Sequence, residues 1–259
     1  MKKTLIALAV AASAAVSGSA MAWTANGTGG SVDMGGTLNP VDKVTPWEVK
    51  TGAAVTGLDA DIVKGQSSVD ISVTNAIPVL GIRTVKAEAF QGRVGINPKI
   101  DFNGAVDFSN AKDGLAKLTL NVLNNSDAKI GNLQADIFTG VGIARNDAAG
   151  GDAYSAYDNN TSFVGGIGNS DQVIGSLKSL KSKANAIDPE FAANFYQMDK
   201  PDIGKWRAPD MSNESHYFSA FYASGIEQGK VLKITLDSPA QGDNAIVWKA
   251  SLPVTVSYE

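Results

Sequence analysis

The sequence predicts an all-β protein, an antiparallel sandwich or barrel of short strands. Residues Ser68–Thr74 and Val231–Leu236 alternate polar and apolar side chains, which is the period of a half-buried strand, and Leu115–Val122 does so less regularly. Turn-forming residues at 124–127 and 238–239 separate such stretches. The alternation of strands with helices that builds a parallel nucleotide-binding sheet is absent from the pattern.

Length and composition limit the classes of function. The chain has 259 residues, 44% hydrophobic and 19% charged, with a net charge of −4 and a pI of about 5.1. Nucleic-acid binding needs a basic stripe, so an acidic chain does not fit it. The absence of cysteine excludes disulfides and thiolate sites, and the single histidine, His216, argues against a histidine metal cluster or a catalytic triad. We expect no cofactor, no metal and no nucleic-acid partner.

The first 22 residues have the three parts of a secretory signal peptide. Lys2 and Lys3 form a positive start, Leu5 to Val16 is an apolar stretch, and Ala20–Ala22 reads as a cleavage site. The apolar stretch is too short to span a bilayer, which needs about 20 residues. We therefore expect residues 1–22 to be a signal peptide and the mature chain to be exported.

Between residues 145 and 215 the period of two is lost, and we expect a partly helical insertion between two strands. Residues 146–151 and 154–160 are small, polar and turn-prone, which predicts loops. Apolar residues at helical spacing follow Asp171, which is a suitable cap for a first helix. A second helix is predicted over 188–200, where an aspartate, a proline and a glutamate come first.

Catalytic motifs are weak, and we expect the chain not to be an enzyme. Gly140–Arg145 begins like a dinucleotide-binding fingerprint but has arginine where the third glycine belongs, and no G-x-S-x-G motif is present. A glycosidase needs two carboxylates, and neighbours such as Asp188 and Glu190 are available, so a secreted β-sandwich glycosidase remains an alternative. His216 has no identifiable partner in the sequence, which favours a structural role.

The strongest alternating patterns stand at the two ends of the mature chain. Ser31–Leu38 follows a glycine-rich leader, and every second residue of 246–258 is apolar up to the end of the sequence at Glu259. Either these are the first and last strands of a self-sufficient sandwich, or the last strand lines an open groove. Such a groove would be filled by the N-terminal strand of another molecule. The pattern alone leaves both readings open.

Both ends also resemble a known family. The first nine residues, MKKTLIALA, and Gly30–Gly36 are similar to the FaeG-type fimbrial subunits of enterotoxigenic Escherichia coli. So are Ser219–Gly229, SAFYASGIEQG, and the closing stretch Trp248–Tyr258, WKASLPVTVSY. Order and spacing agree at both ends, whereas the middle of the chain is less similar.

The resemblance implies a chaperone–usher pilus subunit with an incomplete immunoglobulin-like sandwich that lacks its last strand. In this family a periplasmic chaperone lends a strand until the N-terminal extension of the next subunit replaces it. Residues 23–40 would be the donor-strand extension, and 41–259 the immunoglobulin-like domain with its insertion. The implied donor residues are Val32, Met34, Gly36 and Leu38. The implied residues of the acceptor groove, which also pair with the chaperone, are Ile246, Trp248, Leu252, Val254, Val256 and Tyr258.

Partners and location follow from the same resemblance. The implied partners are identical or related fimbrial subunits, a periplasmic chaperone and an outer-membrane usher. The implied route leads through the periplasm to a fimbrium on the cell surface.

Adhesion to host carbohydrate receptors is also implied, because glycan binding in this family is attributed to a partly helical insertion. Aromatic rings there can stack on the apolar face of a sugar. Trp206 is the expected exposed ring, followed by Tyr154 and Tyr157. The alternative is a minor or purely structural pilin without a sugar site.

Overall fold

The computed structural model describes residues 25–28, 32, 34–39, 44–148 and 150–259. The chain divides into two units, Met1–Lys43 and Val44–Glu259. The predicted signal peptide, residues 1–22, lies outside the described residues. The elements of the second unit are β1 (Trp47–Thr51), β2 (Ser68–Ser72), β3 (Ile77–Thr84), β4 (Phe90–Gln91), β5 (Pro98–Asp101), β6 (Val106–Lys112), β7 (Leu115–Leu123), β8 (Lys129–Asp147), β9 (Gly150–Tyr157), α1 (Leu177–Ile187), β10 (Asp202–Arg207), β11 (Tyr217–Ile226), β12 (Val231–Leu236) and β13 (Thr255–Tyr258).

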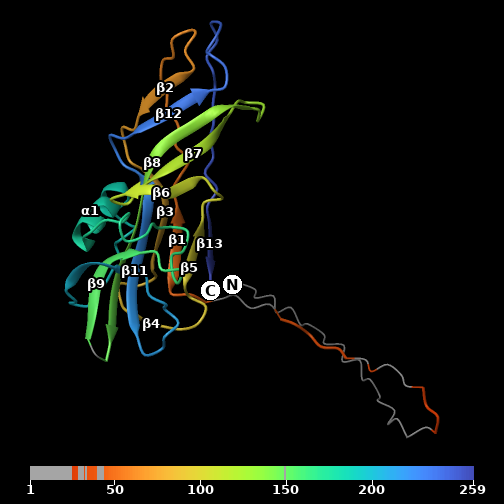
Figure 1. Ribbon diagram of the computed structural model, residues 1–259, viewed down its shortest axis with the longest axis vertical. Coiled ribbons are helices and arrows are strands. Elements are labelled where there is room, and N and C mark those ends of the chain that lie inside the picture. Colours follow the sequence, from red (N-terminus) through yellow and green to blue (C-terminus); the bar gives the residue numbers. More distant parts are fainter. Residues whose placement is uncertain (1–24, 29–31, 33, 40–43, 149) are drawn as a thin grey trace, which may run out of the picture. The chain divides into compact units, whose positions relative to one another are not determined.

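The long strand β8 organises the main sheet (Figure 1). Its first half pairs with β7 on one side and β12 on the other, and its second half pairs with β9 and β11. Along the sheet the order is β1–β3–β11–β8–β12–β2. β13 pairs with β5 in a separate two-stranded sheet, and the chain end packs against the core that the main sheet supplies.

Successive side chains of β8 face two different environments, as alternation in a strand requires. The odd-numbered apolar residues from Leu133 to Ile143 belong to the interior of the sandwich. Even-numbered residues such as Ala144 lie on the outer face, in one cluster with the buried residues of α1. Those residues of α1 are Leu177, Leu180, Ala184 and Ile187.

Glycines on the outer face let the insertion approach the sheet closely. A Cβ atom at Gly140 would stand 2.2 Å from Cδ1 of Leu180, and one at Gly81 would stand 2.1 Å from the ring of Phe191. Carbon atoms do not pack at such distances, so the side chains from the insertion occupy the space that these glycines leave. The insertion is thereby held tightly against β3 and β8.

The helix α1 begins later than the sequence predicts. Ser176 caps it instead of Asp171, because the Ser176 hydroxyl accepts a hydrogen bond from the backbone N–H of Ser179 at 3.2 Å. The residues between Asp171 and Ser176 form turns and bends.

The prediction of a second helix over 188–200 is wrong, since this stretch forms turns. Asn194 Nδ2 donates to the carbonyl of Thr84 at 2.9 Å, and the Thr84 hydroxyl donates to the carbonyl of Asn194 at 3.1 Å. Phe191 and Phe195, whose spacing suggested a helix, are each buried in the outer-face cluster. Bonds between side chains and backbone have replaced the helical ladder here.

Part of the predicted loop is a hairpin. β8 continues to Asp147, and β9 covers most of the stretch that looked loop-like, with Ala144 paired to Ala153. Both alanines are fully buried on the outer face. Small residues occur here because the insertion packs closely on them, not because the backbone turns.

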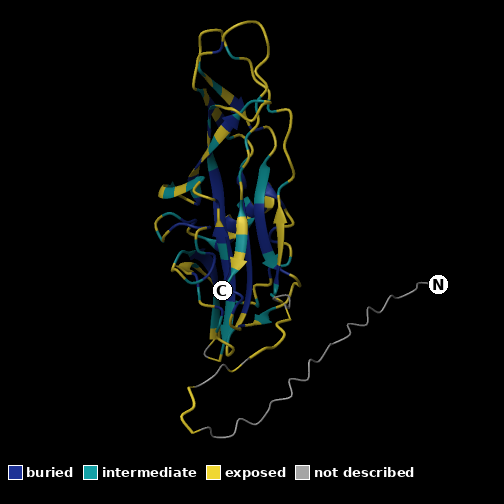
Figure 2. Cartoon of the chain, turned by 90° about the vertical axis from the view of Figure 1, so that its right-hand side faces the viewer, coloured by how far each residue is buried: buried dark blue, intermediate teal, exposed yellow. Residues whose placement is uncertain are grey.

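The result is an all-β, immunoglobulin-like sandwich with open sheets and a partly helical insertion between β8 and β11, as the sequence predicts. Figure 2 shows the buried positions along the central strands and mostly exposed loops at the upper end. No helix among the described residues has the length and apolar character needed to cross a membrane.

Candidate functional site

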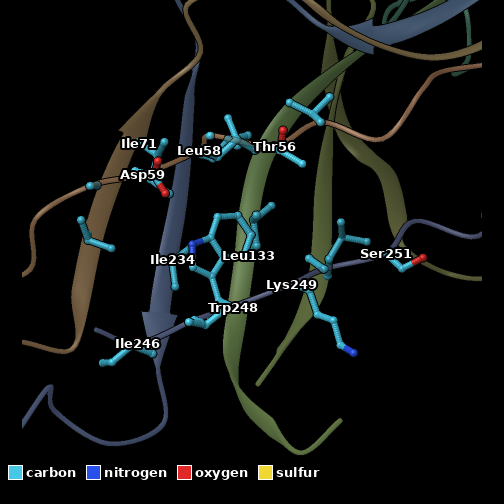
Figure 3. Close-up of a pocket in the computed structure, with 18 of the residues that line it drawn as sticks. Thr56, Leu58, Asp59, Ile71, Leu133, Ile234, Ile246, Trp248, Lys249 and Ser251 are labelled. Atoms are coloured by element: carbon cyan, nitrogen blue, oxygen red, sulfur yellow. The ribbon is translucent and has the colours of Figure 1, made fainter. Parts of the chain in front are cut away.

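A large groove opens on the interior face of the main sheet, over β2, β12, β8 and β7 (Figure 3). It has a volume of about 1390 Å³, well above the usual size of a small-molecule pocket. Two extended segments flank it, residues 53–63 (the first wall) and residues 241–254 (the second wall). Its floor is apolar and includes Ile71, Leu118, Leu133 and Ile234.

The two walls lack backbone partners along most of their length. Among the described residues, no backbone hydrogen bond joins the walls, and residues 53–62 and 241–248 make none at all. On the second wall, Lys249 exchanges two backbone hydrogen bonds with Leu123, at 2.8 and 2.9 Å. Extended segments with free N–H and C=O groups are edges to which a further strand can add.

One end of the groove is closed by contacts between the walls' flanking residues. The backbone N–H of Gly65 donates to the carbonyl of Ala240 at 2.8 Å. Beside this bond, Lys64 forms an ion pair with Asp243. The walls are therefore tied together at this end, and the space between them is open along the stretch that follows.

The first wall departs from the main sheet at Gly52. A Cβ atom there would lie 1.9 Å from the carbonyl oxygen of Pro78, so only glycine fits at this position. The sequence did not predict the first wall as a strand. In the structure only Leu58 and Ile62 among its residues are large, apolar and half-buried. Their spacing is the one weak signal that an alternating segment lies there.

The ladder at the chain end is shorter than the predicted strand. Only Thr255–Tyr258 pairs with β5, so the groove residues predicted before it lie on the second wall without a ladder. These residues are Ile246, Trp248, Leu252 and Val254. Burial still alternates as expected: even-numbered residues of 250–258 are half-buried and odd-numbered ones are exposed. Burial also raises the pKa of the Tyr258 phenol above its ordinary value.

The predicted donor residues are almost fully exposed. Val32 is 83% exposed, Met34 92% and Leu38 96%. Nothing lies within 4 Å of the position that a Cβ atom on Gly36 would take. No strand is present among the described residues of this leader. These three apolar side chains of the leader thus remain available for burial.

Of the three rings predicted to face a sugar, Tyr154 is placed in the core, which corrects that expectation. Its side chain is 0% exposed, and burial raises the pKa of its phenol to about 12. The hydroxyl has no hydrogen-bond partner within the described chain. A ring with no accessible face cannot stack on a ligand.

The other two rings lie on neighbouring strands of the insertion. Trp206 is 45% exposed on β10, and Tyr157 is half-buried on β9, directly paired with Arg207. The guanidinium of Arg207 stands 5.9 Å from the centre of the Trp206 ring. A cation at this distance is attracted to the π-electrons of the ring and lies over one of its faces.

The acidic pair singled out in the sequence is already engaged. Lys50 Nζ donates to Asp188 Oδ2 at 2.6 Å and to Glu190 Oε2 at 2.8 Å. The bond to Asp188 is the main cause that raises the pKa of Lys50. His216 Nε2 lies 3.5 Å from Asp147 Oδ2. Within the described ranges no three histidine, cysteine or acidic residues gather as metal ligands.

Comparison with known proteins finds relatives along the whole chain. The model of the family described as "Fimbrial, major and minor subunit" matches residues 1–259. The chain is 30% identical to K88 fimbrial protein AC and 31% identical to K88 fimbrial protein AB, both of Escherichia coli. It is 27% identical to the F41 fimbrial protein of the same species, and all three alignments cover the whole of both chains. The chain therefore belongs to this family of fimbrial subunits.

Proposed function

We propose that this fimbrial subunit polymerises by donor-strand exchange, in which residues 32–38 of one copy fill the groove of the next. The observation that supports this proposal most is the pair of walls without backbone partners above an apolar floor. A strand laid between the walls would pair with both of them at once. It would thereby complete the sandwich.

The donor segment suits such a groove in its chemistry. Val32, Met34 and Leu38 would project from one face if the segment were extended as a strand, and each large apolar side chain that becomes buried adds roughly 1.5–3 kcal/mol. Main-chain hydrogen bonds to two edges add further stability. Gly36 fits a position where the floor comes too close for a side chain.

Before assembly the same groove needs another cover. An exposed apolar floor between two open edges promotes aggregation. We propose that a periplasmic chaperone supplies a temporary strand that pairs along the second wall, and that an outer-membrane usher is the place of exchange. The predicted signal peptide directs the chain into this route.

Met34→Asp tests the donor assignment. A carboxylate would enter the apolar groove without a partner, which is strongly unfavourable. We expect the ladder of polymers on an unheated denaturing gel to disappear, while monomer bound to the chaperone accumulates normally. The matched control is Val94→Asp, which adds the same charge at a valine that is 81% exposed on the sandwich. A normal ladder from Met34→Asp would overturn the assignment.

We propose further that the assembled fimbria adheres to host carbohydrate through the insertion. Support comes from Trp206, a half-exposed indole on β10, whose neighbouring strand β9 carries the half-buried Tyr157. Trp206→Ala is expected to reduce adhesion to glycan-bearing cells with fibre yield unchanged. Normal adhesion with poor assembly would instead make Trp206 a packing residue. Fimbriae that retain no carbohydrate of any kind would favour the purely structural pilin.

A further inference from the structure

We infer that a neutral sugar binds on a ledge of the outer sheet face formed by Gln91, Tyr217, Asn146 and Tyr196 (the tyrosine ledge). This inference rests on the carbohydrate adhesion proposed above and adds to Trp206 a second site, one for neutral sugars. The ledge lies at the end of the sheet where β8 ends and β11 begins, beside the turns that follow α1.

Three of the four side chains stand in one row across the sheet. Tyr217 on β11 pairs with Asn146 on β8 and with Gln91 on β4. Directly paired residues of antiparallel strands project from the same face, so the aromatic ring has a carboxamide on each side. Tyr217 is 46% exposed, and Gln91 is exposed as well. The row is therefore open to solvent.

The fourth member comes from the turns that follow α1. The backbone N–H of Tyr196 donates to the hydroxyl of Ser219 at 2.9 Å, and Ser219 is two residues beyond Tyr217 on the same face of β11. Tyr196 is 43% exposed. Its neighbour Phe195 packs edge-on against Phe221, with ring centres 5.1 Å apart. This contact fixes the turn that carries Tyr196 next to the row.

The hydrogen-bonding groups of the ledge are largely free. Among the described residues, the Asn146 carboxamide and the hydroxyls of Tyr196 and Tyr217 make no hydrogen bond. Gln91 uses Nε2 to donate to the carbonyl of Glu214 at 2.7 Å, which fixes its carboxamide and leaves Oε1 as an acceptor. A fixed amide, a free amide and two phenols supply both donors and acceptors.

This set matches the chemistry of a pyranose. The C–H face of the ring can stack on Tyr217, and the hydroxyls at its rim can bond to the carboxamides on either side. No member of the ledge carries a charge, which fits a neutral sugar. Trp206, in contrast, shares its ring with Arg207 and is preceded by Lys205, whose Nζ donates to the carbonyl of Ser170 at 2.6 Å. A neutral sugar at Trp206 would have to share the ring with this cation.

The test uses fimbriae assembled from the full chain and titrated on immobilised conjugates of β-galactose, α-mannose, β-N-acetylglucosamine and α-fucose. Tyr217→Ala is expected to weaken binding of the retained conjugate by about tenfold or more relative to wild type. Tyr217→Phe keeps the ring, and its affinity is expected to stay within about threefold of the wild-type value. Asn146→Ala is expected to weaken binding by about three- to tenfold. Val231→Ala, at a valine that is 44% exposed on β12, is the control and is expected to bind as wild type.

The outcomes separate the ledge from the adhesion on which it rests. If wild-type fimbriae retain no conjugate, the proposed adhesion fails and the ledge with it. If wild type binds and Tyr217→Ala binds equally well, the ledge is wrong while adhesion stands, and loss of binding in Trp206→Ala would then place the contact on β10. Should Tyr217→Ala fail to assemble, Tyr196→Ala and Asn146→Ala decide, since unchanged binding in both overturns the ledge.

Discussion

The two faces of β8 are covered in different ways. On the outer face, α1 and the turns after it lie so close to the sheet that Gly140 leaves room for Leu180, which is 0% exposed. On the interior face, over the first half of the strand, the cover consists of two walls with unpaired backbone and an open space between them. A segment of the same domain covers the outer face, whereas the two walls cover only the margins of the interior face.

The difference suits the proposed polymerisation, because one sheet then supports both a stable subunit and a site for the next copy. The insertion begins at the end of β8 and leads to β11, and these two strands are neighbours in the sheet. The packing of the insertion therefore needs no partner chain. The groove is formed by segments near the beginning and the end of the domain. Under the proposed exchange, the outer face is covered by its own chain, whereas the interior face is completed by a strand from another molecule.

The largest effect is expected from removing β13, which would break the interior face. Deleting residues 256–259 takes away most of the strand that pairs with β5 and extends the second wall. We expect the soluble subunit to disappear almost completely from the periplasm, measured by immunoblot with the chaperone co-expressed. Lys99→Ala is the control, because it removes only the ion pair with Glu259. A truncated chain that accumulates as stable monomer would mean that the sandwich needs no donated strand.

A smaller effect on the outer face would sharpen the contrast. Leu180→Ala is expected to lower the stability of assembled fimbriae by about 2–5 kcal/mol and to leave the polymer ladder intact. Gly140→Ala alone is expected to cost about 1–3 kcal/mol through overpacking. The double variant should lose less than the sum, because the new Cβ atom occupies space that Leu180 vacates. Additive losses, measured by calorimetry, would contradict the close packing.

The smallest effect concerns Tyr154, on the closed part of the interior face. Tyr154→Phe removes a buried hydroxyl without a partner and is expected to stabilise assembled fimbriae by about 1 kcal/mol at neutral pH. Burial disfavours the phenolate and raises the phenol's pKa from 10.0 to about 12, so the wild-type protein keeps its full stability below pH 10 and loses stability as the pH rises from 10 toward 12. The advantage of the variant should therefore widen between pH 10 and 12 in thermal melts. A destabilised variant would indicate that the hydroxyl has a partner.

The strands that the sequence predicted are those with regular alternation and one solvated face. Val231–Leu236 and most of Ser68–Thr74 are strands of the sheet because their apolar sides meet the same core cluster. The second helix failed for a reason that spacing cannot reveal. Phe191 fills the space above Gly81, and Asn194 bonds to Thr84, so contacts with β3 determine the backbone of the turns.

The candidate site was predictable in part. Alternation over 246–258 gave the inward-facing residues of the second wall, but it could not tell that most of them lack a ladder partner. The sequence did not reveal that Tyr154 is buried, because small residues such as Ala153 and Ala156 surround it and leave β9 without a regular alternation. The tyrosine ledge depends on the register of β4, β11 and β8, which no single stretch of sequence contains.

The bond between Gly65 and Ala240 also has a consequence for the order of folding. It joins segments near opposite ends of the domain, and closing so large a loop is entropically costly and slow. The hairpins of β6 with β7 and of β8 with β9 are local and can form while the rest of the chain is still being delivered. Under the proposed export route, a chain that crosses the membrane from its N-terminus presents the first wall well before the second. The groove would then form only after both walls have been delivered, so the proposed chaperone would bind a chain only once its second wall has arrived.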